Sequence, residues 1–240
     1  MHFLLSDISK VVDKLIVSNS EFILVAGSLH AKYLKSISRN KRVIFMSPGH
    51  SARPKIFKEK DNYVFTATAW KEGKGLEDLL KTISAIKDVK LNIAGSWIHE
   101  EYYKEILSLV KTLKLEDRVI MLGRVSEEDL NKYYSKAIVA VSINNERGFG
   151  LLALEAASNG CPFIITEDSG AARYFKQNKD GFYFKYGDLN TLREYIQRLV
   201  NDKKLAYEMG QHAWQTVKNN YTWEKHAREL LRMILEYKTS

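Results

Sequence analysis

The stretch SINNERGFGLLALEAASNGCPFIIT, from Ser142 to Thr166, holds the most informative pattern in this sequence of 240 residues. It begins at the end of the apolar run AIVAVSI, passes through a short loop with two glycines, and enters an apolar segment of helical length. The β-branched run PFIIT completes it. A strand, a loop, a helix and a second strand in this order predict a βαβ unit, whose two strands run parallel.

The loop of this unit has residue types that suit a phosphate. Gly148 and Gly150 permit a tight turn and leave backbone N–H groups open at the start of a helix. Unpaired N–H groups and the helix dipole attract anions there. Glu155 follows about one turn later, where a carboxylate can accept hydrogen bonds from the hydroxyls of a ribose. Together these residues suit a nucleotide with a diphosphate, although the glycine pair alone is weak evidence and an ordinary helix glutamate is the commoner explanation of Glu155.

The chain from residue 62 onward repeats the alternation of strand and helix patterns. Strands are expected at residues 63–70, 89–95, 118–122, 137–143, 162–166 and 181–185, and helices at residues 75–89, 102–113, 126–137, 150–160, 189–202, 203–220 and 222–238. Ser126 is an expected N-cap, and a further helix is expected to begin near Gly170. The alternation predicts an α/β fold with a Rossmann-like, doubly wound parallel sheet and ligands at the carboxyl ends of its strands.

Residues 1–60 form a smaller pattern. A strand is expected at 21–26, a basic helix at 29–38 and a strand at 41–46, followed by a linker marked by Pro48 and Pro54. This small N-terminal βαβ unit is too short to bind a nucleotide by itself. We therefore divide the chain into an N-terminal unit (1–60), a nucleotide-binding domain (61–220) and a C-terminal helix (221–240) that packs back towards the N-terminal unit.

The composition is that of a globular protein, with 45% hydrophobic and 28% charged residues. No apolar run is long enough to span a membrane, and the N-terminus lacks the pattern of a secretory signal. The single cysteine, Cys161, excludes an internal disulfide and favours a reducing, cytoplasmic compartment. The six histidines have no metal-ligand spacing, so we expect neither a metal nor another cofactor.

The net charge of +8 is concentrated near the N-terminus. Residues 1–60 contain eleven Lys and Arg against four Asp and Glu, a net charge of +7. Such a face suits anionic lipid headgroups, with peripheral contact to a membrane, or a phosphorylated acceptor; it is equally consistent with an ordinary solvated surface. Nucleic acid is a weaker explanation, because the basic residues are not regularly interleaved with aromatic ones.

Several segments together resemble one family. RGFGLLALEAASNGCPFI (147–164) is similar to the donor-binding motif of the retaining GT-B glycosyltransferases, the large family with bacterial mannosyltransferases, sucrose synthases and lipopolysaccharide hexosyltransferases. KGLEDLL, LNIAGS, RVIMLGRVSEEDLNKYYSKA, DGFYFKYGDLNTLREYI and YTWEKHARELL resemble further parts of the same donor domain, in the same order. The resemblance runs through most of the chain after the N-terminal unit.

The resemblance implies an enzyme that transfers a sugar from a nucleoside diphosphate sugar to an acceptor, with retention of configuration. The donor would contact Lys71, Gly123, Arg124, Val125, Gly148, Phe149, Gly150, Leu151 and Glu155, and the candidate catalytic residues are Lys74, Glu146 and Arg147. In that family the departing phosphate is thought to take the acceptor's proton, so no metal and no dedicated base is required. The protein would position the reactants and stabilise charge on the leaving diphosphate.

Three positions depart from the family pattern. The family's two glutamates are separated by seven residues, but eight lie between Glu146 and Glu155, so either Glu146 still reaches the donor sugar or Arg147 has replaced the acid. Ala69 stands where the family usually has an arginine on the diphosphate, a contact that Arg147 or Lys71 would have to supply. Arg173 stands where the family carries a glutamate.

The N-terminal unit resembles only the last part of the family's acceptor-binding domain. Three explanations stay open: a reduced protein, a fragment, or a cleft completed by another chain. Self-association into a homodimer would cover the apolar surface that a truncated domain exposes. A catalytically inactive relative that binds a nucleotide sugar or acts as a scaffold is the alternative function, and another doubly wound enzyme that uses activated sugars is a third.

Overall fold

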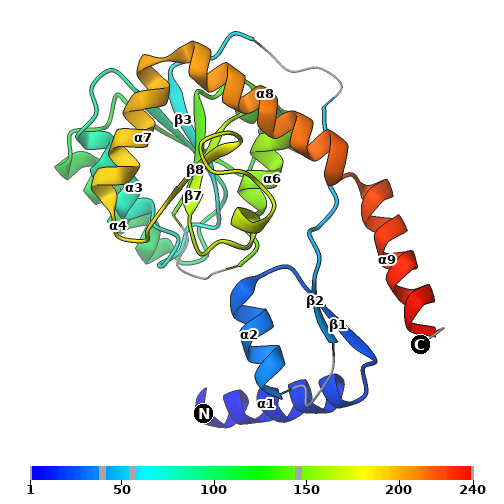
Figure 1. The fold of residues 1–240 in the computed structure, drawn as a ribbon. Helices are drawn as coiled ribbons and strands as arrows, with labels where there is room; N and C mark the ends of the chain where they lie inside the picture. The colour runs from blue at the N-terminus through cyan, green and yellow to red at the C-terminus, as the bar shows by residue number, and fades with distance from the viewer. Residues whose placement is uncertain (1, 38–41, 54–57, 144–147, 239–240) are drawn as a thin grey trace.

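The computed structural model describes residues 2–37, 42–53, 58–143 and 148–238, and contains two parallel sheets (Figure 1). The larger sheet has six strands in the order β5-β4-β3-β6-β7-β8. Its strands are β3 (Tyr63–Ala67), β4 (Lys90–Ala94), β5 (Val119–Gly123), β6 (Val139–Ser142), β7 (Phe163–Thr166) and β8 (Gly181–Phe184). The strand order reverses direction at β3 and β6, which confirms the predicted doubly wound sheet.

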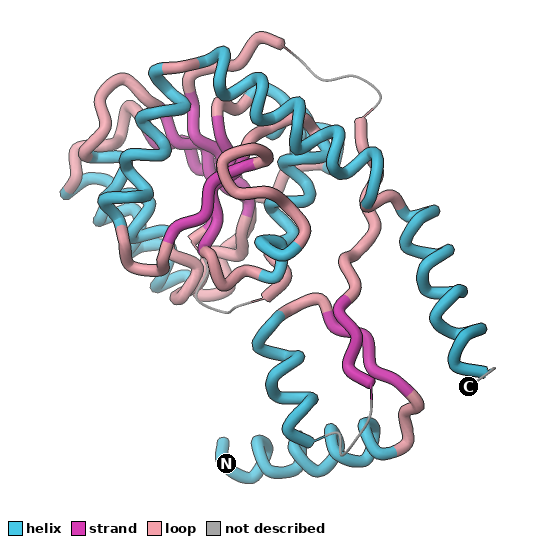
Figure 2. Tube along the Cα trace, in the orientation of Figure 1, coloured by secondary structure: helices cyan, strands magenta, loops and turns pink. Residues whose placement is uncertain are grey.

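Helices cover both faces of this sheet (Figure 2). One face packs against α3 (Leu76–Ser84), α4 (Glu100–Thr112) and α7 (Leu189–Asn201), and the other against α5 (Glu127–Lys136), α6 (Leu151–Ser158) and α8 (Lys203–Asn220). The strands are apolar on both sides: Val64 belongs to one core and Phe65 to the other, and both are fully buried. Such coverage is why these strands read as continuous apolar runs. We call β3 to β8 with α3 to α8 the six-stranded body (residues 63–143 and 148–220).

Local signals in the sequence account for the helices of the body. Leu76, Leu79, Leu80 and Ile83 are all buried on α3, as their helical spacing predicts. The Ser126 hydroxyl accepts a hydrogen bond from the Asp129 amide at 3.1 Å, which confirms the predicted N-cap of α5. The helix predicted to begin near Gly170 is instead the short 3₁₀ helix η1 (Gly170–Arg173), because the chain turns at Tyr174 and packs Phe175 into the core.

The N-terminal unit contains the expected βαβ pattern and one additional helix. β1 (Phe22–Val25), α2 (Ser28–Ile37) and β2 (Arg42–Phe45) match the prediction, and β1 pairs with β2 in a separate two-stranded parallel sheet. The helix α1 (His2–Ser18) precedes them and was not predicted. From here on, the term N-terminal unit refers only to α1, β1, α2 and β2 (residues 2–37 and 42–45), a narrower range than the predicted residues 1–60.

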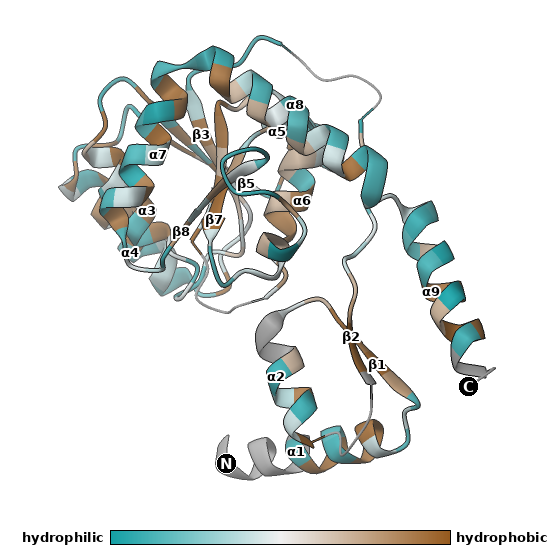
Figure 3. Ribbon diagram, in the orientation of Figure 1, coloured by the Kyte–Doolittle hydropathy of each residue, from teal (hydrophilic) through white to brown (hydrophobic). Residues whose placement is uncertain are grey.

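Most of the described apolar side chains of α1 lie on its exposed face. The apolar residues in this part of the sequence therefore did not reveal a helix that packs against a core. Val11, Val12, Leu15 and Ile16 are between 46% and 61% exposed, whereas Val17 is buried. On the inner side of α1, the Asp13 carboxylate accepts a hydrogen bond from the Tyr33 hydroxyl of α2 at 2.9 Å. Figure 3 shows apolar bands on the described part of α1 and on the C-terminal helix α9 (Trp223–Lys238).

The connector after β2 and the start of α9 join the two parts. Nδ1 of His226 lies 2.8 Å from the Ser47 carbonyl oxygen, and the His50 amide donates to the Tyr221 carbonyl at 2.8 Å. A Cβ added at Gly49 would lie 2.7 Å from the Trp223 ring, so only glycine allows this approach. Within the described residues, no helix is long and apolar enough to cross a membrane.

Candidate functional site

A cavity of about 320 Å³ opens at the carboxyl ends of β3, β4 and β5. Its lining residues come from the last positions of β3 and β4, from the loops that follow the three strands, and from the first turn of α5: Ala67, Thr68, Ala69, Ala94, Gly95, Ser96, Arg124, Val125 and Leu130. This is the edge where a doubly wound sheet binds its ligands. Two predicted donor contacts, Arg124 and Val125, therefore face a real cavity.

Two glycines shape the cavity. A Cβ at Gly95 would lie 1.8 Å from the Thr68 carbonyl oxygen, so β3 and β4 can converge here only because residue 95 has no side chain. Gly123, another predicted contact, has a φ of +69°, which turns the chain out of β5 and directs Arg124 and Val125 to the cavity wall. Gly123 is not among the lining residues, so its predicted contact with the donor stays a prediction.

The glycine loop (Gly148 to Gly150) leads directly into α6. Gly150 is the N-cap of α6, with a φ of +85°, and a Cβ there would lie 2.3 Å from the Ser169 hydroxyl oxygen. Gly148 has no positive φ, and a Cβ there would face open space. Of the two glycines, only Gly150 therefore adopts a backbone conformation that favours glycine. The Leu151 and Leu152 amides have no acceptor within the helix and are available to an anion, whereas the Ala153 amide donates to the Gly150 carbonyl at 3.0 Å.

The segment from Ser169 through η1 supports the glycine loop from behind. The Gly170 amide donates to the Gly148 carbonyl at 2.8 Å, and the Ala171 amide donates to the Phe149 carbonyl at 2.6 Å. The Ser169 hydroxyl also donates to the Phe149 carbonyl, at 2.9 Å. The Phe149 side chain is buried, so its predicted donor contact can involve only the backbone. These bonds fix the carbonyl side of the loop and leave its amide side for a ligand.

Glu155 is held by a buried tyrosine. The Tyr134 hydroxyl donates to Glu155 Oε2 at 2.7 Å, and the Tyr134 ring stacks edge-on against Phe65. Burial, and then the neighbouring Glu155 carboxylate, raise the pKa of the Tyr134 phenol well above its usual value, so the phenol stays protonated and keeps donating. The sequence treated Tyr134 as a packing residue. Tyr134 lies 21 residues before Glu155 and in a different helix, so the spacing gave no signal of this contact.

The loop that carries Lys71 and Lys74 lies against the end of β6. Gly75 caps α3 with a φ of +73°, and a Cβ there would lie 2.5 Å from the Ile143 side chain and carbonyl. Ile143 is the last residue that the structure describes before Gly148. Lys71 and Lys74 are both partly buried on this side of the sheet. Glu146 and Arg147 lie outside the described residues, so the choice between them as the family's first acid stays a prediction.

Three aromatic side chains pack together next to the lining residues Ala69 and Ser96. Trp70 is buried, and its ring stacks on Tyr103 at 5.7 Å, while Trp97 stacks on Tyr103 at 4.6 Å. Trp97 follows the lining residue Ser96 and is 47% exposed. In the described part of the chain, no group of three or more His, Cys, Asp or Glu side chains is arranged to hold a metal ion.

Arg173 points towards the N-terminal unit. Its guanidinium lies over the Phe45 ring of β2, 4.0 Å from the ring centroid. The sequence singled out Arg173 as a departure from the family pattern, but its partner lies more than a hundred residues away and could not be found from spacing.

Known proteins resemble this chain over most of its length. A family model described as "Glycosyl transferases group 1" matches residues 50–216. The N-acetyl-alpha-D-glucosaminyl L-malate synthase of Bacillus anthracis is 25% identical over 170 residues, which are 70% of this chain and 43% of that protein.

Two solved structures share the fold. Sucrose-phosphate synthase from Thermosynechococcus elongatus superposes with a TM-score of 0.83 at 24% identity, covering 96% of this chain and 62% of that one. HepE of Anabaena, solved in complex with UDP and glucose, superposes with a TM-score of 0.83 at 15% identity, covering 95% of this chain and 66% of that one. The chain thus spans less than half of the first relative's length and less than two thirds of the synthase structure.

Proposed function

The chain belongs to the glycosyl transferases group 1 family, and we propose that it binds a nucleoside diphosphate sugar and transfers the sugar to an acceptor with retention of configuration. One observation supports this above all. The cavity at the carboxyl ends of β3 to β5 is flanked by a loop and helix start that suit a diphosphate. HepE, a structural neighbour, was solved with UDP and glucose, which agrees with this substrate class.

The nucleoside would occupy the cavity. The base would lie against the backbone of Arg124 and Val125, and the ribose hydroxyls would donate to the Glu155 carboxylate, which Tyr134 orients through Oε2. The diphosphate would then accept hydrogen bonds from the amides at the start of α6. Lys71 and Lys74 supply positive charge on the opposite side, where Ala69 provides none.

The transfer itself is a substitution at the anomeric carbon. The bond between this carbon and the diphosphate oxygen breaks, and its electron pair leaves with the diphosphate. An acceptor oxygen forms the new bond on the same face, and its proton passes to the departing phosphate oxygen. The residues named above would stabilise the developing negative charge, with Lys74 nearest to it and either Glu146 holding the sugar or Arg147 adding a cation.

The acceptor side of the enzyme would involve the N-terminal unit. The outer face of α1 combines the exposed Val11, Val12, Leu15 and Ile16 with the exposed Lys14, while Asp13 is turned inward towards Tyr33. An apolar and basic helix face of this kind suits an anionic membrane surface in the cytoplasm, and a lipid-phosphate acceptor there. Sedimentation with phosphatidylglycerol vesicles but not phosphatidylcholine vesicles would support the contact; a stable homodimer that buries the same face would contradict it.

Nucleotide binding is the first experiment. Thermal shifts are measured with UDP, GDP, ADP and their common sugar conjugates, and we expect one nucleotide to stabilise the protein. A ligand at 100 times its Kd stabilises by about 2.7 kcal/mol, and each kcal/mol raises the Tm of a protein of this size by about 2–4 °C. The absence of any shift would contradict the proposed function.

Matched variants then locate the site. Glu155→Gln should weaken the binding of the selected nucleotide by about tenfold, because it replaces a charged acceptor with a neutral one. Glu101→Gln, an exposed glutamate on α4, carries the same charge change and should leave the affinity unaltered. Donor turnover distinguishes an active transferase from a catalytically inactive relative. Nucleotide binding without release of the sugar, with every plausible acceptor present, would favour the inactive relative. Ala69 in the cavity wall, which stands in place of an arginine, already suggests this alternative.

A further inference from the structure

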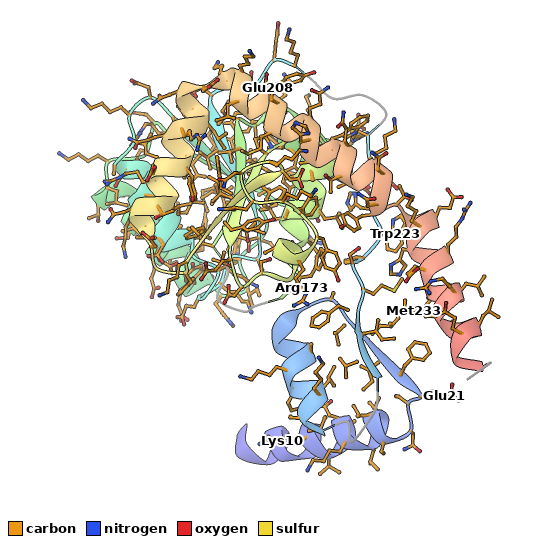
Figure 4. The ribbon with its side chains drawn as sticks, in the orientation of Figure 1. Lys10, Glu21, Arg173, Glu208, Trp223 and Met233 are labelled. Carbon is orange, nitrogen blue, oxygen red and sulfur yellow. The ribbon has the colours of Figure 1, made fainter. Side chains whose placement is uncertain are left out.

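The short helix η1 contacts two regions that are far apart in the sequence. On one side, its amides and the preceding Ser169 hold the carbonyls of the glycine loop. On the other side, Arg173 reaches the N-terminal unit, as the labelled side chain in Figure 4 shows. η1 therefore lies between the candidate diphosphate site and the unit expected to face the acceptor.

Gly170 marks the point where the three segments converge. A Cβ added there would lie 2.5 Å from the Ala26 carbonyl oxygen of the N-terminal unit and 2.9 Å from Cα of Phe149 in the glycine loop. Backbone from both sides thus comes within contact distance of one residue. A shift of the N-terminal unit against η1 must be accommodated by the glycine loop, because no side chain lies between them to absorb it.

Arg173 is the residue best placed to control this contact. Its guanidinium carbon is 4.0 Å from the centroid of the Phe45 ring, within the range of a strong cation–π interaction. Lys35 also approaches this ring, but at 5.9 Å. Arg173 is the last residue of η1, which is only four residues long. A contact of its side chain therefore constrains the position of the whole short helix.

We propose that Arg173 is a positioning residue, which fixes η1 against Phe45 and so holds the glycine loop in the conformation that binds the diphosphate. The proposal rests on the proposed function for the identity of the ligand. It gives a purpose to the arginine that stands where the family carries a glutamate. A glutamate cannot stack on an aromatic face as a guanidinium does, so the contact with Phe45 requires the arginine.

A double-mutant cycle in the full chain tests the proposal. Arg173→Ala and Phe45→Leu should each raise the Kd of the nucleotide found by thermal shift, by about two- to fivefold. The double variant should be no weaker than the weaker single variant, because both changes remove one interaction. Arg173→Lys, which keeps a cation over the ring, should recover part of the affinity.

The chain offers a matched control. Arg198 of α7 lies over the Phe182 ring at 5.4 Å, in the same kind of contact but away from the glycine loop. Arg198→Ala should leave the Kd unchanged. An equal effect of Arg198→Ala, an unaltered Kd in Arg173→Ala, or two single effects that simply multiply in the double variant would each overturn the proposal.

Hydrogen exchange of the nucleotide-free protein gives a readout that does not depend on the proposed function. In Arg173→Ala, peptides that cover residues 169–174, whose Gly170 and Ala171 amides donate to the glycine-loop carbonyls, should exchange several times faster, while peptides from β4 and β7 keep their wild-type protection. If the wild-type protein binds no nucleotide but the exchange changes as described, the proposed function fails and the coupling stands. If nucleotide binds but neither Kd nor exchange changes, the coupling fails and the function stands.

Discussion

The six-stranded body and the N-terminal unit are both built from parallel strands, but they bury those strands to different extents. Every residue of β7 is buried, and so are four of the five in β3, whereas β1 has only one buried residue, Val25. Parallel strands are stable when both faces are covered. The inner strands of the body meet this requirement, whereas its edge strand β5 has no buried residue, and the N-terminal unit meets the requirement only in part.

The difference shows where each region obtains its stability. The body has two continuous apolar cores, one on each face of its sheet. The N-terminal unit depends on contacts with its surroundings, such as Phe45 under Arg173 and the close approach of Ala26 to Gly170. We therefore expect substitutions in the body to affect global stability, and those in the N-terminal unit to act locally.

Large-to-small substitutions should separate the two regions most clearly. Phe65→Ala removes a fully buried ring that stacks against Tyr133 and Tyr134, and should lower the free energy of unfolding by about 3–5 kcal/mol. Ile44→Ala in β2, which is half-buried, should lower it by about 1 kcal/mol. Urea unfolding of both variants measures the two values. Equal losses would mean that the N-terminal unit shares one cooperative core with the body.

Lys60→Met should produce a smaller loss at the entrance to the body. The buried Lys60 ammonium donates to the carbonyls of Ser135 and Gly160 at 2.7 and 2.8 Å, and removing it leaves both acceptors unpaired. We expect the free energy of unfolding to fall by about 1–3 kcal/mol in urea titrations. An unaltered midpoint would show that water satisfies these carbonyls.

The same lysine predicts a pH dependence. Burial lowers the pKa of Lys60 in the folded protein below its usual 10.5, so the unfolded chain binds more protons between the two pKa values. The contribution of Lys60 to stability therefore rises with pH across that interval. Unfolding free energies of wild type minus Lys60→Met, measured from pH 7 to 10, should increase, and a difference that falls with pH would contradict the burial effect.

Loss of a helix cap should be smaller again and confined to the body. Ser126→Ala removes the acceptor of the Asp129 amide at the start of α5, which should lower the free energy of unfolding by about 1 kcal/mol. Ser36→Ala is the control in α2, because its hydroxyl only donates to the Tyr33 carbonyl within the same helix. Hydrogen exchange should show faster opening of α5 and no change in α2. Faster exchange in both helices would argue against separate regions.

The smallest expected effect uses the single thiol as a reporter. Cys161 is fully buried, and burial raises its pKa to about 12, so a thiol reagent should modify it only when the body opens. Phe45→Leu in the N-terminal unit should leave the labelling rate unchanged. A rate that increases in Phe45→Leu would show that the N-terminal unit supports the packing around Cys161.

The sequence predicted the body far better than it predicted the N-terminal unit. Buried parallel strands and amphipathic helices leave strong periodic signals, and the Ser126 cap and the face of α3 were confirmed residue by residue. The helix α1 was missed because Val11 and Leu15, its most regular apolar residues, face outward. These apolar residues of α1 lie on the outer surface of the protein, and they do not contribute to a core.

The candidate site was predictable only where a motif fixes the backbone. The strand-loop-helix order predicted a tight turn at Gly150, which has a positive φ, and the family resemblance implied the donor contacts Arg124 and Val125, which line the cavity. The bond from Tyr134 to Glu155 and the contact of Arg173 with Phe45 join residues from different elements. Such partners depend on tertiary packing, which spacing along the chain does not encode.

The four tryptophans are distributed over both ends of the molecule in a way that makes them natural fluorescent probes. Trp70 and Trp97 lie beside the cavity, with Trp97 partly exposed next to the lining residue Ser96. Trp214 donates to the Arg53 carbonyl, and Trp223 packs over Gly49, so this second pair reports on the connector. Replacing one pair with phenylalanine leaves an emission signal from the other, so filling of the cavity and movement of the connector can be recorded separately, and in real time, without any attached dye.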